Sequence, residues 1–279
     1  MQTCTVDIPA KINLILHISG SYPDGYHRLD MLNTTVAIYD TVKVRESDTV
    51  WAEMDGKACD ERNTALRALR AVQEKYGKAF CARIVKRIPM CAGLGGSSAD
   101  ASAVLLAVNR WLDRPMSELE EIALGIGADC PYMLHGGYMR VRGKGEELTP
   151  VSDMPKLHLV IAQNAVGGST GQVYGAYDAD PCAPRQSWEQ AATHIRNGQD
   201  GTDNVLTRAA VKLCSQIQDA IEHMRKFTPI AWMTGSGSAV VGVFADEESA
   251  RRAQQNWKLN GTCIVTQTCD GARITVSEK

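Results

Sequence analysis

The segment 89–103 (PMCAGLGGSSADASA) constrains the fold and chemistry of this chain more than any other part of the sequence. Its glycines allow positive φ angles and let the backbone approach a ligand closely. A serine pair follows, and an alanine-rich, apolar helix is predicted over residues 99–112. The free N–H groups and the dipole of a first helical turn favour an anion such as a phosphate. Serine hydroxyls can add hydrogen bonds to phosphate or serve a magnesium ion.

This loop differs from the two best-known glycine-rich nucleotide motifs. It lacks the GK[ST] ending of a Walker A loop, and the G-x-G-x-x-G spacing of a dinucleotide-binding fingerprint does not fit it. From the residues alone one structural alternative stays open, a flexible strand-to-helix turn whose serines only cap the helix.

Two further motifs strengthen the phosphate interpretation. In PAKINLIL, Lys11 and Asn13 are two apart on a predicted strand, so both project from one face. A buried lysine there needs a carboxylate or phosphate partner, whereas an edge-strand lysine in solvent needs none. Near the C-terminus, TGSGSAVVGVF joins two predicted strands through Gly235, Ser236 and Gly237. Alone this is a hairpin turn, but beside the first loop it suggests a second backbone wall for a substrate or phosphate.

Composition and charge exclude several classes of function. The formal net charge is -2 and no block of Lys/Arg forms a basic face, which argues against nucleic-acid binding. No apolar run approaches a membrane span, and Pro9 and Lys11 interrupt the N-terminal region before a signal-peptide core develops. The nine cysteines have no CxxC spacing, and the histidines have no HxxxH spacing, so we expect buried free thiols rather than a metal site. These features predict a cytoplasmic protein that binds neither membrane nor nucleic acid.

The order of predicted elements indicates a two-layer α/β (α+β) chain with a domain boundary near Pro150. Asn63 is a predicted N-cap, Gly77 a helix stop, and Ser117 with Glu120 a capping box. Strands are predicted over 11–18, 34–44, 81–88 and 157–163, and on both sides of the glycine turn within 230–244. Helices are predicted over 64–76, 99–112, 171–177, 187–196, 205–225 and 245–257, with a loop-like insert at 178–185.

In this order, PAKINL, PMCAGLGGSSADA and GSGSAVVGVF resemble the three sequence blocks of the GHMP kinase superfamily. PAKINLILHISGSYPDGYHRLDML, GIGADCPYML (125–134) and STGQVYGAYD (169–178) resemble more specifically the branch that phosphorylates cytidyl-diphospho methylerythritol in the non-mevalonate isoprenoid pathway. The similarity runs from the first strand to past residue 244. It implies a small-molecule kinase that uses ATP and Mg²⁺. It also implies two domains, an ATP-binding one over 1–150 and a C-terminal one over 151–279, with the active-site cleft between them.

The resemblance also implies roles for individual residues. Asp129 matches the catalytic base that accepts the proton of the attacking hydroxyl, and Lys11 matches the cation that keeps it ionised. Without the resemblance, Asp129 reads as a helix-end turn residue. For Asn63 two roles stay open, a contact with the adenine side of ATP and a plain helix N-cap. The residues expected at ATP are Pro89, Gly93, Leu94, Gly95, Gly96, Ser97, Ser98, Ala99 and Asn63. Those expected at the substrate are Asn13, Tyr26, His27, Tyr174, Gly235, Ser236 and Gly237.

One departure from the family pattern concerns the phosphate loop. The family commonly shows GLxGGSS followed by Asp or Asn, whereas here the serine pair comes one place earlier and Ala99 separates it from Asp100. ATP binding should survive, and either Ser97 or Ser98 could reach the phosphates or magnesium. The alternatives to the cytidyl substrate are another GHMP kinase, of homoserine or mevalonate type, or an inactive nucleotide-binding regulator on the same fold. The expected assembly is a monomer or a weak homodimer.

Overall fold

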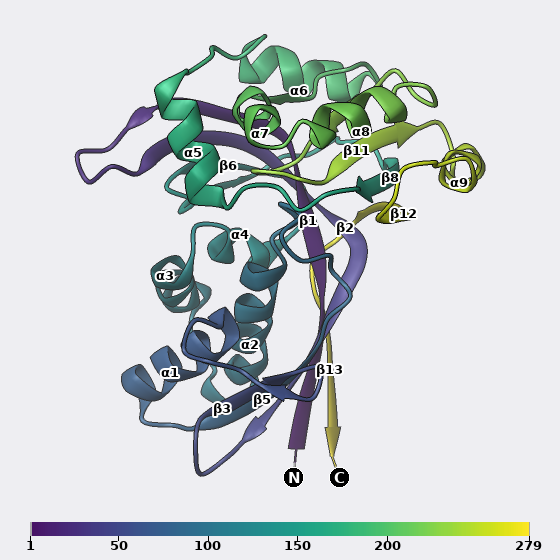
Figure 1. Cartoon of the computed structure of the whole chain (residues 1–279). Coiled ribbons are helices and arrows are strands. Elements are labelled where there is room, and N and C mark those ends of the chain that lie inside the picture. The colour runs from purple at the N-terminus through teal and green to yellow at the C-terminus, as the bar shows by residue number, and fades with distance from the viewer. Residues whose placement is uncertain (1, 279) are drawn as a thin grey trace.

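The computed structural model describes residues 2–278, and Figure 1 shows two lobes joined by a pair of long antiparallel strands. These strands are β1 (Gln2–Ser21) and β2 (His27–Glu46), and they pair along most of their length. Apolar and β-branched residues recur along both, which favours extended backbone in a buried sheet. The register shifts between Pro9 and Ala10 and again after Asn13, so the strands bend as they pass from one lobe to the other.

Helices α1 (Thr64–Tyr76), α2 (Gly96–Leu112), α3 (Met116–Ile126) and α4 (Cys130–His135) form the first lobe together with short strands. Every residue of α2 from 99 to 108 is buried, so this helix is the centre of the lobe. α1 begins and ends as predicted, since Asn63 Oδ1 accepts a hydrogen bond from the Leu66 N–H (3.1 Å) and Gly77 is left-handed. The strands are β3 (Trp51–Met54), β4 (Lys57–Ala58) and β5 (Phe80–Val85).

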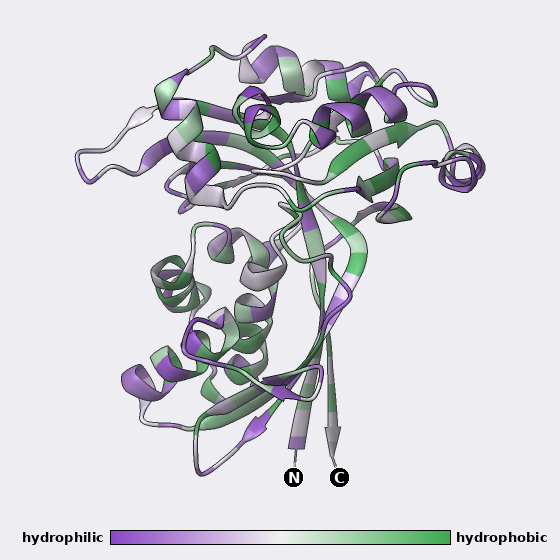
Figure 2. Ribbon diagram, viewed as in Figure 1, coloured by the Kyte–Doolittle hydropathy of each residue, from purple (hydrophilic) through white to green (hydrophobic). Residues whose placement is uncertain are grey.

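The second lobe places helices over a mainly antiparallel group of strands (Figure 1). Figure 2 shows the contrast between hydrophobic β11 and the hydrophilic helix α9, which lies at the edge of this lobe. The strands are β8 (His158–Gln163), β9 (Asp203–Asn204), β10 (Ala231–Met233), β11 (Val240–Phe244) and β12 (Thr262–Cys269). The helices are α5 (Thr170–Ala179), α6 (Trp188–Arg196), α7 (Thr207–Leu213), α8 (Gln216–Met224) and α9 (Glu247–Gln255).

A single connected sheet runs through both lobes within the described residues. Its main path is β10-β11-β8-β12-β2-β5-β3-β4, and β1 pairs with β2, with β9 and with β13 (Arg273–Glu278). The hairpin of β6 (Met139–Gly143) and β7 (Glu147–Pro150) attaches to β2 through β6. The last strand of the chain therefore returns to the first one, and β1 is held from both sides.

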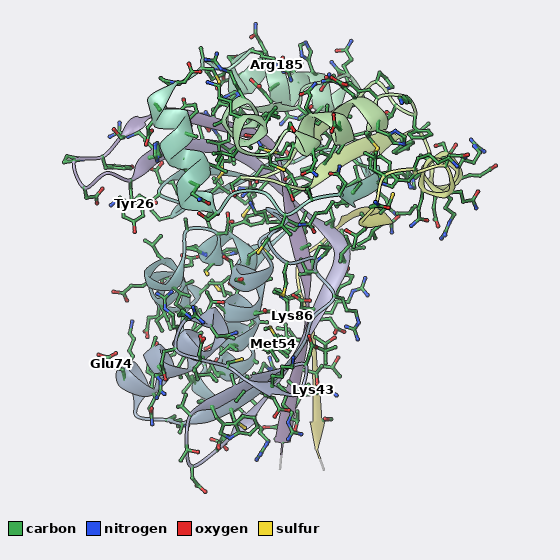
Figure 3. All side chains as sticks on the ribbon, viewed as in Figure 1. Tyr26, Lys43, Met54, Glu74, Lys86 and Arg185 are labelled. Atoms are coloured by element: carbon green, nitrogen blue, oxygen red, sulfur yellow. The ribbon has the colours of Figure 1, made fainter. Side chains whose placement is uncertain are left out.

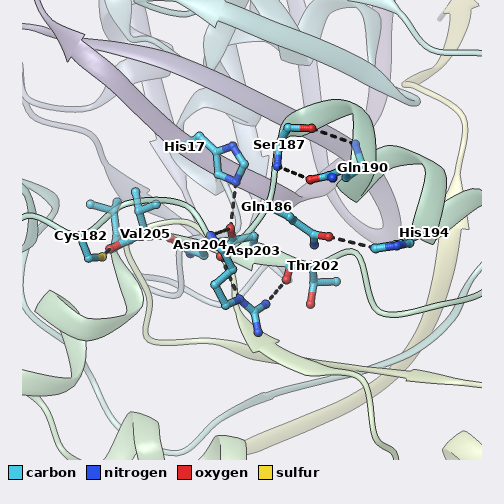
Figure 4. A network of polar contacts seen from close by, with 12 residues as sticks. His17, Cys182, Gln186, Ser187, Gln190, His194, Thr202, Asp203, Asn204 and Val205 are labelled. Carbon is cyan, nitrogen blue, oxygen red and sulfur yellow. Dashed lines mark hydrogen bonds and ion pairs between the residues drawn. The ribbon is translucent and has the colours of Figure 1, made fainter.

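A buried polar network fastens β1 to the second lobe, as Figure 4 shows. His17 Nε2 lies 3.0 Å from Asp203 Oδ2, which also accepts a hydrogen bond from the backbone N–H of Arg185 (2.8 Å). Burial acts to raise the pKa of Asp203, but the hydrogen bonds from His17 and from the Arg185 amide lower it overall. The network holds the predicted insert, residues 178–185, in place. The first two residues of this insert belong to α5.

Two predictions about helices were wrong. Residues 205–225 form two helices rather than one, because Cys214 is extended between them. The break lets α7 pack on α5 while α8 packs on β10 and β11. The predicted capping box of Ser117 and Glu120 does not form, because α3 already begins at Met116, after Pro115. None of the helices within residues 2–278 combines the length and the apolar character needed to cross a bilayer.

Candidate active site

A cavity of about 930 Å³ lies between the lobes, and both lobes contribute to its walls. In Figure 3, Tyr26 is at the end of the β1–β2 hairpin, whereas Met54 and Lys86 are on the other lobe; all three line the cavity. The predicted Ala99 is buried inside α2 and does not line it. The predicted residues in the lining are Lys11, Asn13, Tyr26, His27, Asn63, Pro89, Gly93, Leu94, Gly95, Gly96, Ser97, Ser98, Asp129, Tyr174, Gly235, Ser236 and Gly237.

Lys11 and Asp129 form an ion pair at the centre of this lining. The Lys11 Nζ lies 3.2 Å from Asp129 Oδ2 and donates a second hydrogen bond to Asn13 Oδ1 at 2.7 Å. Lys11 is buried in β1, whereas the Asp129 side chain keeps 29% of its surface exposed toward the cavity. Asp129 stands directly before α4, in the segment that follows α3. The exposed carboxylate can therefore meet a ligand while the lysine holds it from behind.

Asn13 connects the PAKINLIL motif to the TGSGSAVVGVF motif. Its Nδ2 donates to Asn33 Oδ1 (2.7 Å), and its backbone N–H donates to the hydroxyl of Thr234 (2.8 Å). The indole N–H of Trp232 in turn donates to the backbone carbonyl of Asn13 (2.8 Å). The Asn13 side chain is thus engaged by Lys11 and Asn33, which fixes the position of the ammonium.

The glycine loop lies directly on β1. The backbone N–H of Lys11 donates to the carbonyl of Leu94 (3.0 Å), and a Cβ on Gly95 would come within 2.8 Å of Lys11 Cγ. Because Gly95 also has a φ of 71°, any other residue would be strained and would displace the lysine. The loop is therefore shaped around the Lys11 side chain.

Helix α2 begins at Gly96, three residues before the predicted start, so both loop serines belong to its first turn. The first intrahelical hydrogen bond runs from Ala99 N–H to the Gly95 carbonyl (2.8 Å). The amides of the preceding residues are among the unpaired donors that every helix start presents. They line the cavity at Gly96, Ser97 and Ser98, which makes this turn a site for an anion.

The third motif packs back to back against the glycine loop. A Cβ on Gly93 would lie 2.6 Å from the Thr234 carbonyl oxygen, and a Cβ on Gly235 would lie 2.6 Å from the Gly93 carbonyl oxygen. Both glycines have positive φ, 76° and 59°. The Ala239 N–H also donates to the Ala92 carbonyl (3.1 Å). Two glycine turns from opposite lobes thus share one seam along the cavity.

The hairpin end of the cavity is aromatic. The His27 ring lies 4.7 Å from the Tyr174 ring, centroid to centroid, and His27 Nε2 is 2.7 Å from Asp178 Oδ1. Burial raises the pKa of Tyr174, so its phenol stays neutral. Tyr26 is 60% exposed and borders the same space. These side chains offer ring faces and hydrogen-bonding groups to a flat, polar ligand.

At the opposite end, Asn63 lines the cavity while its side chain caps α1. The Thr64 hydroxyl donates to the Ser97 carbonyl (2.6 Å), so the start of α1 is tied to the start of α2. Ser97 is exposed and Ser98 is half-buried. The Ser98 hydroxyl lies beside Gly127 and Cys130, on the segment that carries Asp129.

A buried ion cluster beneath the loop could not be found by motif. The Lys86 ammonium pairs with Asp40 and, at 2.8 Å, with Asp100 Oδ2. It also lies 3.1 Å from where a Cβ on Gly96 would be. Burial and the neighbouring Asp40 raise the pKa of Asp100 to about 7, although Lys86 opposes this. Asp100 belongs to the glycine-loop motif, but nothing in the sequence indicates that it pairs with Lys86.

Comparison with known families supports a kinase fold. Residues 63–137 match the family described as GHMP kinases N terminal domain, and residues 181–262 match GHMP kinases C terminal. The 4-diphosphocytidyl-2-C-methyl-D-erythritol kinase of Bacillus pumilus is 32% identical over 268 residues, 91% of this chain and 92% of that one. Its namesake in Caldicellulosiruptor saccharolyticus is 34% identical over 276 residues, 94% of this chain and 95% of that one.

Solved structures of kinases have a similar fold. A crystal structure of 4-(cytidine 5'-diphospho)-2C-methyl-D-erythritol kinase superposes with a TM-score of 0.79 at 29% identity, covering 95% of this chain and 98% of the other. A homoserine kinase from Cytophaga hutchinsonii superposes with a TM-score of 0.66 at 18% identity, covering 99% of this chain and 94% of that one. The second likeness shows a common fold.

Proposed function

The chain belongs to the family of 4-diphosphocytidyl-2-C-methyl-D-erythritol kinases, within the GHMP kinases, and from that membership we propose how its cavity phosphorylates the 2-hydroxyl of this substrate with ATP. The observation that carries the proposal is the Lys11–Asp129 ion pair, 3.2 Å long, between a helix start and an aromatic pocket. This reaction requires a general base, an anion site and a pocket for the cytosine ring, and one cavity offers all three.

Asp129 is the proposed general base. Its carboxylate accepts the proton of the substrate hydroxyl as that oxygen attacks the γ-phosphorus of ATP. The new P–O bond forms on the hydroxyl oxygen, and the bond to ADP breaks with its electron pair on the β-phosphate oxygen. The Lys11 ammonium lies between Asp129 and Asn13, where it orients the carboxylate and attracts the oxygen that becomes negative.

ATP is proposed to lie with its phosphates on the first turn of α2, where free amides and the helix dipole favour negative charge. Its base would then extend toward Asn63 and Pro89. Mg²⁺, when bound, would neutralise charge on the phosphates. Ser98 fits as its protein ligand better than Ser97, because the Ser98 hydroxyl is near the Asp129 segment. Within residues 2–278 no group of three or more His, Cys, Asp or Glu side chains could hold a metal, so phosphates and water would supply most ligands.

The cytidine of the substrate is proposed to bind at the hairpin end. His27, held by Asp178 and packed against Tyr174, can hydrogen-bond the polar edge of the pyrimidine. The exposed ring of Tyr26 and the face of Tyr174 offer stacking surfaces. The turn at Gly235, Ser236 and Gly237 would close the cavity beside the acceptor alcohol.

Further proposals concern the enzyme as a whole. Residues 1–150 are proposed as the ATP-binding domain and 151–279 as the second domain, although β13 returns to β1. We propose a cytoplasmic enzyme that acts as a monomer or a weak homodimer. The compartment is supported by the cysteines, all nine of which are free, as thiols in a reducing environment are.

The deciding experiment measures ADP release by purified protein with ATP and Mg²⁺. The cytidyl substrate is compared with mevalonate and homoserine at equal concentrations. Turnover confined to the cytidyl substrate supports the proposal. Preference for mevalonate or homoserine would keep the kinase and overturn the substrate. ATP binding without turnover of any of them would favour an inactive nucleotide-binding regulator.

A further inference from the structure

Lys144 occupies the turn between β6 and β7 and lines the hairpin end of the cavity. The next residue, Gly145, has a φ of 123°, and a Cβ on it would lie 2.1 Å from the carbonyl oxygen of Ala128. The turn therefore packs tightly against the residue that precedes Asp129. Lys144 is thus placed by the same segment that carries the proposed base.

The Lys144 side chain reaches from that turn to the β1–β2 hairpin. Its ammonium forms an ion pair with Asp24 and lies 4.8 Å from the Tyr26 ring centroid and 5.1 Å from that of Tyr22. Cation–π contacts of this kind hold a lysine in one direction without removing it from solvent. Hydrogen bonding to Asp24 raises the pKa of Lys144, so the ammonium is fully charged at neutral pH.

Other cations line the cavity, but they are committed elsewhere. Lys11 pairs with Asp129 and Asn13, and Lys86 is buried between two carboxylates. Arg62 pairs with Asp60 at the opposite end, beside Asn63. Lys144 differs from Lys11 and Lys86 because its carboxylate partner is 52% exposed and can be released to water when a stronger anion arrives. It differs from Arg62 because it lies at the hairpin end of the cavity.

We propose that Lys144 is a specificity residue that binds the diphosphate of the cytidyl substrate, exchanging Asp24 for phosphate oxygens. The inference rests on the proposed function, which places the pyrimidine at His27 and the acceptor hydroxyl at Asp129. The diphosphate must bridge these two points. The turn that carries Lys144 packs through Gly145 on Ala128, beside Asp129, and the Lys144 ammonium lies over the Tyr26 ring, beside His27. A charge-assisted contact to phosphate would select a nucleoside-diphosphate-linked alcohol over a small acceptor without one.

Lys144→Gln and Asp24→Asn separate this role from a structural one. Loss of a charge-assisted hydrogen bond corresponds to roughly a tenfold to hundredfold loss of affinity. Lys144→Gln should therefore raise the KM for the cytidyl substrate by about that factor, with kcat and the KM for ATP nearly unchanged. Lys144→Arg should restore most of the affinity. Asp24→Asn keeps an oxygen for the Tyr26 amide but frees Lys144, so it should lower the KM.

If Lys144 only holds the β6–β7 turn against the β1–β2 hairpin, both Lys144→Gln and Asp24→Asn would raise the KM for the cytidyl substrate, because each breaks the same ion pair. That result, or an unchanged KM in Lys144→Gln, overturns the proposal. Inhibition by cytidine diphosphate gives a second readout, since its inhibition constant should follow the KM across the variants. Turnover of the cytidyl substrate by the wild-type protein distinguishes a failure of the proposed function from a failure of this inference. Its absence rejects the proposed function, whereas its presence with indifferent Lys144 variants rejects this inference alone.

Discussion

The ammonium of Lys11 lies 3.2 Å from the carboxylate of Asp129, although one belongs to the first strand and the other to the start of α4. The lysine is almost fully buried and has Asn13 as its second partner, so its position is determined by the core. The carboxylate faces the cavity. This arrangement makes Asp129 the group whose chemistry depends on charge and whose replacement should leave the fold in place.

Asp129→Asn should lower kcat by about 10²–10⁴-fold, because an amide cannot accept the proton of the attacking hydroxyl. The dissociation constant for ATP should change only a few-fold. Steady-state ADP release and equilibrium nucleotide binding measure the two effects. Asp113→Asn, at the end of α2, is the matched control and should leave both values in place. Equal losses of ATP binding and turnover in Asp129→Asn would mean that the residue is structural.

Gly93→Ala should destabilise the protein by about 2 kcal/mol or more, since a Cβ at positive φ is strained and would strike the Thr234 carbonyl. The ATP dissociation constant should rise in the same variant, because the two glycine turns share one seam. Gly125→Ala in α3 meets no atom within 4 Å and should be neutral or slightly stabilising. Thermal unfolding and nucleotide titration check both variants, and equal behaviour of the two alanines would contradict the packing argument.

His27→Ala should raise the KM for the cytidyl substrate by roughly tenfold to hundredfold, with a smaller change in kcat, since a hydrogen bond to the pyrimidine is lost. The KM for ATP should not follow. His158→Ala, on β8 and outside the cavity lining, serves as the control. Unaltered kinetics in His27→Ala would remove the main support for cytidine at the hairpin end.

Asp100→Asn tests the buried cluster with Lys86 through pH. The pKa of Asp100 is about 7 in the fold, against about 4 in an unfolded chain. The native state therefore keeps a proton that the unfolded state has released. This contribution to stability is complete below about pH 4 and is lost as the pH rises through about 7.

The unfolding free energy of Asp100→Asn relative to the wild type should therefore improve between pH 5 and pH 8, by about 2 kcal/mol. Urea unfolding at the two pH values measures it, and Asp48→Asn at the surface gives the baseline. A difference that stays constant with pH would show that Asp100 does not titrate in this range.

Local signals in the sequence predicted much of the secondary structure. Asn63 and Gly77 set the limits of α1 because the cap and the left-handed stop act within one turn of the chain. The break at Cys214 could not be predicted, since it depends on which neighbours α7 and α8 pack against. The 20-residue length of β1 was also missed, because its first residues pair on one side with β13, which is distant in sequence.

The residues of the candidate site also divide into those that a local signal in the sequence predicts and those that it does not. Motifs in the sequence identified Lys11, the glycine loop and Gly235, which line one cavity in the structure. Asp129 was identified only through the family resemblance. Lys144, Asp40 and Lys86 lie in no motif, and the motif that contains Asp100 does not indicate its ion pair. Their roles depend on distances between separate segments, and only three-dimensional structure gives these.

The pairing of β13 with β1 has a consequence for how the protein is made. The strand that carries Lys11 is synthesised long before β13, because β2 to β12 and α1 to α9 lie between them in the chain. Until then β1 has an open edge, and open edges of long apolar strands invite pairing with other chains. Contacts this distant in sequence also slow folding. Closure of this edge of β1 is therefore a late event in the life of each newly made molecule.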